Sequence, residues 1–232
     1  MTVSSDSPTP RREFLGQMAA SAIVLAGAAC ATPMSAAQTV ATPSPAQPNS
    51  SQTKWDDSWT GRLASKHKAV FDSPEIAENA TLGVGQAIRY INGVHEALGA
   101  EAQAVVVIRH KAIPFAFNDA MWEKYKIGEE SKVKIGDAWA TKNPLLNGHA
   151  NGNGDRPQGN LVWLALHGHI LLGCDLAAQG FAAGYAEKSK RTTKEVYEDL
   201  KANLVPGLIL QPNGVYAVLR AQEAGCVYMR ST

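Results

Sequence analysis

Short apolar runs alternate along this chain with longer segments in which apolar residues recur every three or four positions. The run Ala104-Val105-Val106-Val107-Ile108 is almost entirely β-branched, which is typical of a strand buried on both faces of a parallel sheet. Further strands are predicted at 169–173, 208–210 and 225–229, and helices at 80–99, 114–125, from about 175, at 192–203 and at 215–224. This alternation predicts one α/β domain, with a mostly parallel central sheet flanked by helices and right-handed βαβ connections.

The segment Leu161–Phe181 is the part of this pattern that most suggests chemistry. It predicts the end of a short helix, a buried strand, a turn that carries Cys174, and a new helix from about Asp175. A thiol between the end of a strand and the start of a helix lies where open α/β folds bind their ligands, and the positive end of the helix favours a reactive thiolate. The alternative is an inert thiol buried between Leu172 and Leu176.

Arg109 and His110 directly follow the predicted strand at 104–108. If that strand neighbours the strand before Cys174, all three residues lie at one edge of the sheet. An imidazole could deprotonate the thiol or bind a metal or haem, and an arginine could hold an anion such as thiosulfate or sulfite. We therefore predict Arg109, His110 and Asp119 as substrate-binding residues beside Cys174. The alternative is a structural corner in which Arg109 pairs with Asp119.

Three other features lie outside this predicted site. Residues 126–160 are polar and rich in Gly and Asn, which predicts a long functional lid or mobile loop. Trp55 and Trp59 are expected to cover the edge of the domain, and residues 72–75 predict a turn into a short helix. His167 and His169 are predicted at a helix end and a strand start, on the edge opposite Cys174, and we do not predict a metal there.

The first 37 residues resemble an export signal more than part of the fold. Arg11-Arg12 is followed by Phe14-Leu15 and by an apolar, Ala-rich stretch too short to span a membrane, which is the pattern of a twin-arginine signal. Cleavage after Ala37 would release a chain whose residues 38–54 are a disordered linker and whose residues 55–232 are the domain. The sequence thus predicts a periplasmic protein that contacts the membrane only through its signal, with lipid attachment at Cys30 as the less favoured alternative.

The composition supports an ordinary globular domain. The 232 residues are 45% hydrophobic and 19% charged, with a formal net charge of +1, so nothing favours nucleic-acid binding. Removal of the signal would leave only Cys174 and Cys226. Because the periplasm permits disulfides, one bridge between them is an alternative to two free thiols.

Several segments of the chain also occur in a familiar order. In chain order, Val107-Ile108-Arg109-His110 and residues 114–122 come first, and the strand that leads to Cys174 and an Ala-rich helix comes next. Three further segments follow: Leu204-Val205-Pro206-Gly207, Pro212-Asn213-Gly214-Val215 and Gln222-Glu223-Ala224-Gly225. In this order and spacing, residues 80–229 resemble the DsrE/DsrF-like sulfur-relay proteins, and especially an exported branch with twin-arginine signals.

The resemblance implies a small α/β fold that assembles into homo-oligomers. It also implies that Cys174 occupies the place of a cysteine that carries sulfane sulfur as a persulfide, so that the partners would be the export machinery and a small sulfur species or a partner protein. No cofactor is implied, although haem or a metal is not excluded. The alternative function is a non-catalytic periplasmic protein that binds a small ligand or haem, or acts in assembly, in which Cys174 only packs.

Overall fold

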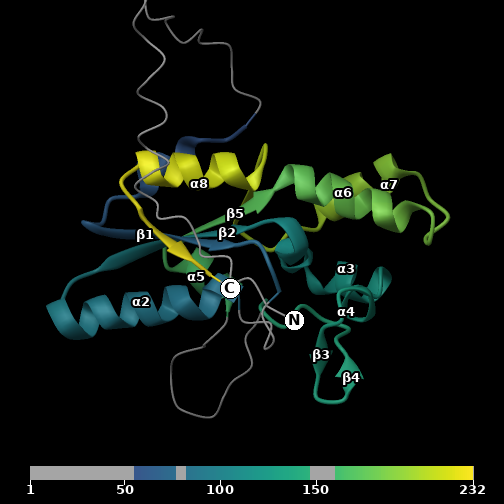
Figure 1. The fold of residues 1–232 in the computed structure, drawn as a ribbon, viewed down its shortest axis with the longest axis horizontal. Helices are drawn as coiled ribbons and strands as arrows, with labels where there is room; N and C mark the ends of the chain where they lie inside the picture. Colours follow the sequence, from purple (N-terminus) through teal and green to yellow (C-terminus); the bar gives the residue numbers. More distant parts are fainter. Residues whose placement is uncertain (1–54, 77–81, 147–159, 232) are drawn as a thin grey trace, which may run out of the picture. The chain divides into compact units, whose positions relative to one another are not determined.

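A five-stranded sheet, in which every pair of neighbours is parallel, forms the centre of the computed structural model (Figure 1). The structure describes residues 55–76, 82–146 and 160–231, all in the unit Ser50–Thr232, so the predicted signal, the linker and Cys30 lie outside the described residues. The strands are β1 (His67–Ser73), β2 (Ala102–Ile108), β5 (Ile170–Cys174), β6 (Leu208–Gln211) and β7 (Val227–Arg230). Their order is β6-β5-β2-β1-β7.

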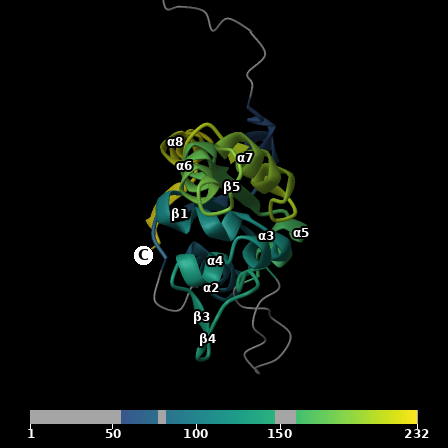
Figure 2. The ribbon, with the colours of Figure 1, turned by 90° about the vertical axis from the view of Figure 1, so that its right-hand side faces the viewer.

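Helices flank this sheet on both faces, which confirms the predicted α/β fold class (Figure 2). One face carries the helices α2 (Leu82–Leu98), α5 (Leu161–Leu166) and α6 (Asp175–Ala186), together with the 3₁₀ helix η3 (His110–Ala116). The other face carries α8 (Gly214–Glu223) and the 3₁₀ helix η2 (Ser58–Arg62). Helix α7 (Thr193–Ala202) packs on α6. Among the described residues, no helix has the length and apolar character needed to cross a membrane.

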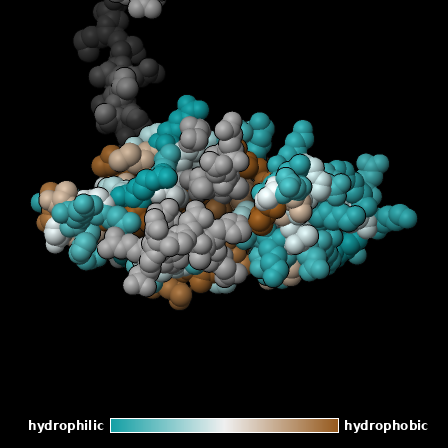
Figure 3. Space-filling model, turned by 90° about the horizontal axis from the view of Figure 1, so that it is seen from below, coloured by the Kyte–Doolittle hydropathy of each residue, from teal (hydrophilic) through white to brown (hydrophobic). Residues whose placement is uncertain are grey.

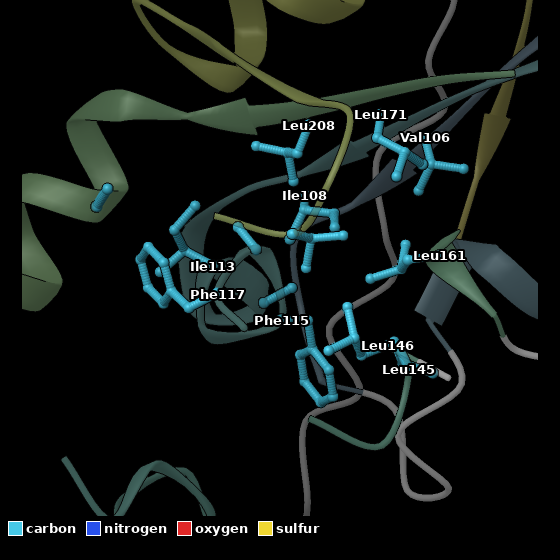
Figure 4. Packing of buried hydrophobic residues seen from close by; sticks show 14 of the residues in the cluster. Val106, Ile108, Ile113, Phe115, Phe117, Leu145, Leu146, Leu161, Leu171 and Leu208 are labelled. Atoms are coloured by element: carbon cyan, nitrogen blue, oxygen red, sulfur yellow. The ribbon is translucent and has the colours of Figure 1, made fainter. Parts of the chain in front are cut away.

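The core consists of two layers because side chains of a strand alternate between the two faces of the sheet. Val106 and Ile108 of β2 point into the larger layer, where Phe115, Phe117 and Leu161 pack (Figure 4). Val105 and Val107 of the same strand point into the smaller layer beneath α8. On the outside, apolar patches interrupt a largely hydrophilic surface on the face that Figure 3 shows.

Strand β1 was not predicted, and it corrects the expectation of a turn at 72–75. Asp72 and Ser73 are the last residues of this strand, and both are buried. The apolar run in β1 is short, since His67 and Lys68 precede it and Asp72 follows it. A parallel strand usually gives a longer apolar run, and here a buried ion pair of Asp72 takes the place of one apolar residue.

The predicted helix at 114–125 is also wrong. Pro114 lies inside η3, and a separate helix, α3 (Asp119–Lys124), begins after Asn118. The side chain of Asn118 accepts a hydrogen bond from the backbone N–H of Met121, which is the usual way for such a residue to begin a helix. Two short elements therefore replace one long helix, and they hold the segment after β2 close to the sheet.

The segment 126–160 is more structured than the predicted loop. It contains α4 (Ile127–Glu130) and a hairpin of β3 (Lys134–Ile135) and β4 (Ala138–Trp139), whereas residues 147–159 lie outside the described residues. Trp59 also departs from its predicted place at the domain edge, because it is fully buried in the layer beneath α8.

Candidate functional site at the carboxyl edge of the sheet

Cys174 is the last residue of β5 and the N-cap of α6, so it lies between a strand and a helix as the sequence predicted. Its Sγ accepts a hydrogen bond from the backbone N–H of Ala177 at 3.3 Å. The residue is 6% exposed. The sulfur thus lies at the positive end of a 12-residue helix and receives one of its unpaired N–H groups, an arrangement that stabilises negative charge on sulfur.

Two helices begin side by side at this edge and then diverge to opposite faces of the sheet. Helix α6 follows β5 into the larger core layer, and α8 follows β6 into the smaller one. The N–H of Leu176 donates to the carbonyl of Pro212 at 3.3 Å and so joins the two helix starts, while Asn213 caps α8 by accepting from Tyr216. Open α/β sheets bind ligands where the connections after adjacent strands diverge in this way.

Arg109 lies on the neighbouring strand, in line with Cys174. The strand register pairs Ile108 with Gly173. The residues that follow them, Arg109 and Cys174, therefore lie at the same edge of the sheet. The guanidinium of Arg109 donates from Nε to Oδ1 of Asp72 at 2.6 Å and from Nη2 to Oδ2 at 2.8 Å. This bidentate hydrogen bonding is the main cause that raises the pKa of Arg109. The predicted alternative, a pair between Arg109 and Asp119, is therefore wrong.

The same arginine packs against the start of α8. A Cβ placed on Gly214 would lie 2.4 Å from Cδ and 2.5 Å from Cβ of Arg109. Tyr228 of β7 donates a hydrogen bond to Asp72 at 3.0 Å from the other side. Arg109 is thus held between β1, β7 and α8. Among the described residues, none accepts a hydrogen bond from its Nη1.

His110 lies at this edge as predicted, and it is exposed. Its backbone has a φ of 51°, in the left-handed region that a residue with a side chain seldom adopts. Its Nδ1 is 3.1 Å from Oε1 of Glu75, whose pKa is lowered chiefly by a hydrogen bond from Lys111. His110 lines a pocket of about 490 Å³ together with Ala177, the residue whose N–H contacts the sulfur of Cys174.

Asp119 lies elsewhere. It is the first residue of α3, and its Oδ1 accepts a hydrogen bond from the backbone N–H of Asn143 at 2.9 Å. The side chain of Asn143 in turn donates to the carbonyls of Phe115 and Phe117. Asp119 therefore anchors the chain that leads away from the β3–β4 hairpin, and the structure gives it no contact with Arg109 or Cys174.

Both described cysteines are free thiols, so the alternative of a Cys174–Cys226 bridge is not realised. Cys226 precedes β7 and is as buried as Cys174, but no helix begins at it. Burial raises the pKa of Cys226 to about 11, although Lys68 opposes the shift. The two thiols thus differ in their electrostatic surroundings more than in their exposure.

Sequence reasoning missed Asp72 and Gly214, the two residues that fix Arg109. Asp72 could have been found from the short apolar run before it, which would have placed a carboxylate at the end of a strand.

The sequence prediction did place His167 and His169 correctly, at the opposite edge of the sheet, after α5 and before β5. Within the described ranges, no group of three or more His, Cys, Asp or Glu side chains could hold a metal ion.

Comparison with known proteins leaves the family of this chain open. No family model and no curated protein matches it. Among solved structures it is similar to a protein of unknown function, MTH1491 from Methanobacterium thermoautotrophicum, with 14% sequence identity and a TM-score of 0.34. That match covers 71% of this chain and 98% of the other.

Proposed function

We propose that this chain carries sulfane sulfur on Cys174 as a persulfide. The observation that supports the proposal best is the position of the sulfur as N-cap of α6, hydrogen-bonded to the N–H of Ala177, at the edge where α6 and α8 diverge. A persulfide carrier needs a thiolate at rest and a stabilised terminal anion when loaded. The start of a long helix serves both needs.

The proposed step uses no external oxidant. The thiolate of Cys174 attacks the outer sulfur of a donor R–S–S⁻, a new S–S bond forms, and the old one breaks. The leaving group R–S⁻ takes the electron pair of the broken bond, so the products are Cys174–S–S⁻ and R–S⁻. With thiosulfate as donor the leaving group is sulfite. Delivery to an acceptor thiolate reverses the same exchange.

Arg109 and His110 have separate roles in this proposal. Arg109 already neutralises Asp72, so it offers a fixed N–H donor at Nη1 and no free positive charge. His110 lines the pocket that Ala177 also lines, next to the Cys174 sulfur that the N–H of Ala177 contacts, and in this proposal its imidazole borders the entering sulfur donor. Asp119 has no part in the step.

The location and assembly of the protein belong to the same proposal. The twin-arginine pattern around Arg11-Arg12 supports export to the periplasm, and the order of segments around Cys174 supports a sulfur-relay protein that forms homo-oligomers. The export machinery and a sulfur donor or acceptor are the proposed partners. No cofactor is needed for the exchange.

Intact mass spectrometry tests the proposal directly. The reduced protein is incubated with glutathione persulfide or with thiosulfate, and a gain of one sulfur atom at Cys174 is expected. Cys174→Ser should abolish the gain, since serine keeps an N-cap oxygen but cannot form the persulfide. Cys226→Ser is the matched control and should load normally. Peptide mapping separates these sites from Cys30.

A clear result would contradict the proposal. If neither donor adds sulfur to protein whose Cys174 is reduced and can still be alkylated by iodoacetamide, Cys174 is not a persulfide carrier. Loading that persists in Cys174→Ser and disappears in Cys226→Ser would move the chemistry to the other thiol.

A further inference from the structure

A second cavity lies at the opposite edge of the sheet, where the strands begin. It has a volume of about 610 Å³, within the usual range for small-molecule sites. Ile88 and Ile91 of α2 and Ala102 of β2 contribute apolar lining, and Trp163 of α5 contributes an aromatic side chain. His167 and His169 line it too, together with the polar residues Ser65, Asn92, His95, Glu101 and Gln103. None of these residues takes part in the site around Cys174.

His169 provides a hydrogen-bond donor in this cavity. The residue is 5% exposed, and its Nδ1 accepts a hydrogen bond from the backbone N–H of Ala104 at 3.3 Å. In the neutral ring the proton must then be on Nε2. Burial, and secondarily the nearby His167, lower the pKa of His169 to about 4, so the ring is neutral near pH 7. No described residue accepts a hydrogen bond from Nε2.

His167 and Trp163 form a stack beside this donor. Their ring centroids are 4.1 Å apart with an interplanar angle of 23°, and the indole lies 5.8 Å from the ring of His169. Nδ1 of His167 is 2.8 Å from the carbonyl of Trp163, so it donates there. The cavity thus offers flat aromatic groups, an apolar side and, at Nε2 of His169, an N–H that no described residue accepts.

We propose that this cavity binds a planar aromatic molecule with a carbonyl oxygen or ring nitrogen that accepts a hydrogen bond from Nε2 of His169. Flat ligands gain most from an aromatic wall, and the N–H at Nε2 favours a ligand that presents a hydrogen-bond acceptor to it. Glu101 also borders the cavity, and its negative charge favours a neutral ligand over an anion. The inference does not depend on the chemistry of Cys174.

A pair of probes that differ only in their acceptors tests this proposal. 2,3-Dimethyl-1,4-naphthoquinone has two carbonyl acceptors and no open position for attack by a thiol, whereas 2,3-dimethylnaphthalene has the same skeleton without acceptors. Titration followed by tryptophan fluorescence should show binding of the quinone about tenfold tighter than that of the hydrocarbon, because only the quinone can accept the hydrogen bond from Nε2 of His169.

Variants locate the binding in the cavity. Trp163→Leu should weaken binding of the quinone about tenfold by removing the aromatic wall, whereas Trp139→Leu, an exposed tryptophan of β4 outside the cavity, should leave it unchanged. His169→Phe should remove the preference for the quinone. Equal binding of both probes to the unmodified protein, no binding of the quinone, or binding unaffected by Trp163→Leu would overturn the proposal, even if His169→Phe did not fold.

Discussion

Arg109 and Asp72 form a bidentate ion pair across two neighbouring parallel strands, with hydrogen bonds of 2.6 and 2.8 Å. Asp72 is almost completely buried, and its Oδ2 also accepts a hydrogen bond from Tyr228. The pair therefore connects β1, β2 and β7 at the edge of the sheet where Cys174 lies. It orients Arg109 and at the same time cancels its charge.

Replacing Asp72 with asparagine should lower the free energy of unfolding by about 2 kcal/mol, because two charge-assisted hydrogen bonds of Arg109 are weakened. The loss stays moderate because the guanidinium is partly exposed and can reach water. Urea unfolding measures the change. Glu75→Gln is the control: its pairs with His110 and Lys111 are exposed, so it should change stability by less than about 0.5 kcal/mol. Equal losses in the two variants would contradict this account.

Gly214→Ala should destabilise the protein by about 1 to 3 kcal/mol, because the added methyl group would overlap Arg109. Gly184→Ala in α6 is the matched control. A Cβ at Gly184 meets no atom within 4 Å, so there the better helix propensity of alanine should raise stability by up to about 1 kcal/mol. The unfolding temperatures of the two variants should therefore shift in opposite directions. An unchanged or higher unfolding temperature for Gly214→Ala would show that Arg109 moves away without cost.

The strands with long apolar runs could be predicted from the sequence, and β1 could not. Val105 to Ile108 of β2 are buried on both faces, so their pattern is unambiguous. In β1 only Ala69, Val70 and Phe71 are apolar, and Asp72 is buried because Arg109 pairs with it. The partner that makes this carboxylate compatible with burial is 37 residues away in the chain, and local periodicity does not contain it.

The candidate site was predicted in part for the same reason. The strand–thiol–helix order around Cys174 is a local pattern, and the structure has it. Asp119 was predicted to bind substrate beside Cys174, or alternatively to pair with Arg109, and in the structure its Oδ1 accepts a hydrogen bond from the backbone N–H of Asn143. Gly214 is required by the approach of the Arg109 side chain, so only the folded arrangement of β2 and α8 reveals it.

Cys174 should react with iodoacetamide at least about tenfold faster than Cys226 at pH 7.5, although the two are equally buried. Cys174 receives the N–H of Ala177 at the start of a helix, whereas burial raises the pKa of Cys226 to about 11. Quenched alkylation followed by peptide mass analysis gives both rates in one sample. Comparable rates would mean that the helix start does not activate Cys174 and would weaken the proposed sulfur chemistry.

The stability of the protein should fall as the pH is lowered from about 6.5 to about 4, in part because of His169. The unfolded chain binds a proton on this residue near pH 6.5, whereas burial keeps the pKa in the folded protein at about 4. Between these values the unfolded state holds the extra proton, so stability decreases with falling pH, by up to about 3 kcal/mol for this one group.

His169→Phe isolates that contribution, because it retains a flat buried ring that does not titrate. The variant starts from a lower stability at pH 7.5, since the N–H of Ala104 loses its acceptor, but it should lose less stability on acidification than the unmodified protein. Urea unfolding at pH 7.5 and 4.5 gives the two differences. Identical pH dependence in the unmodified protein and in His169→Phe would show that His169 is protonated as readily in the folded chain as in water.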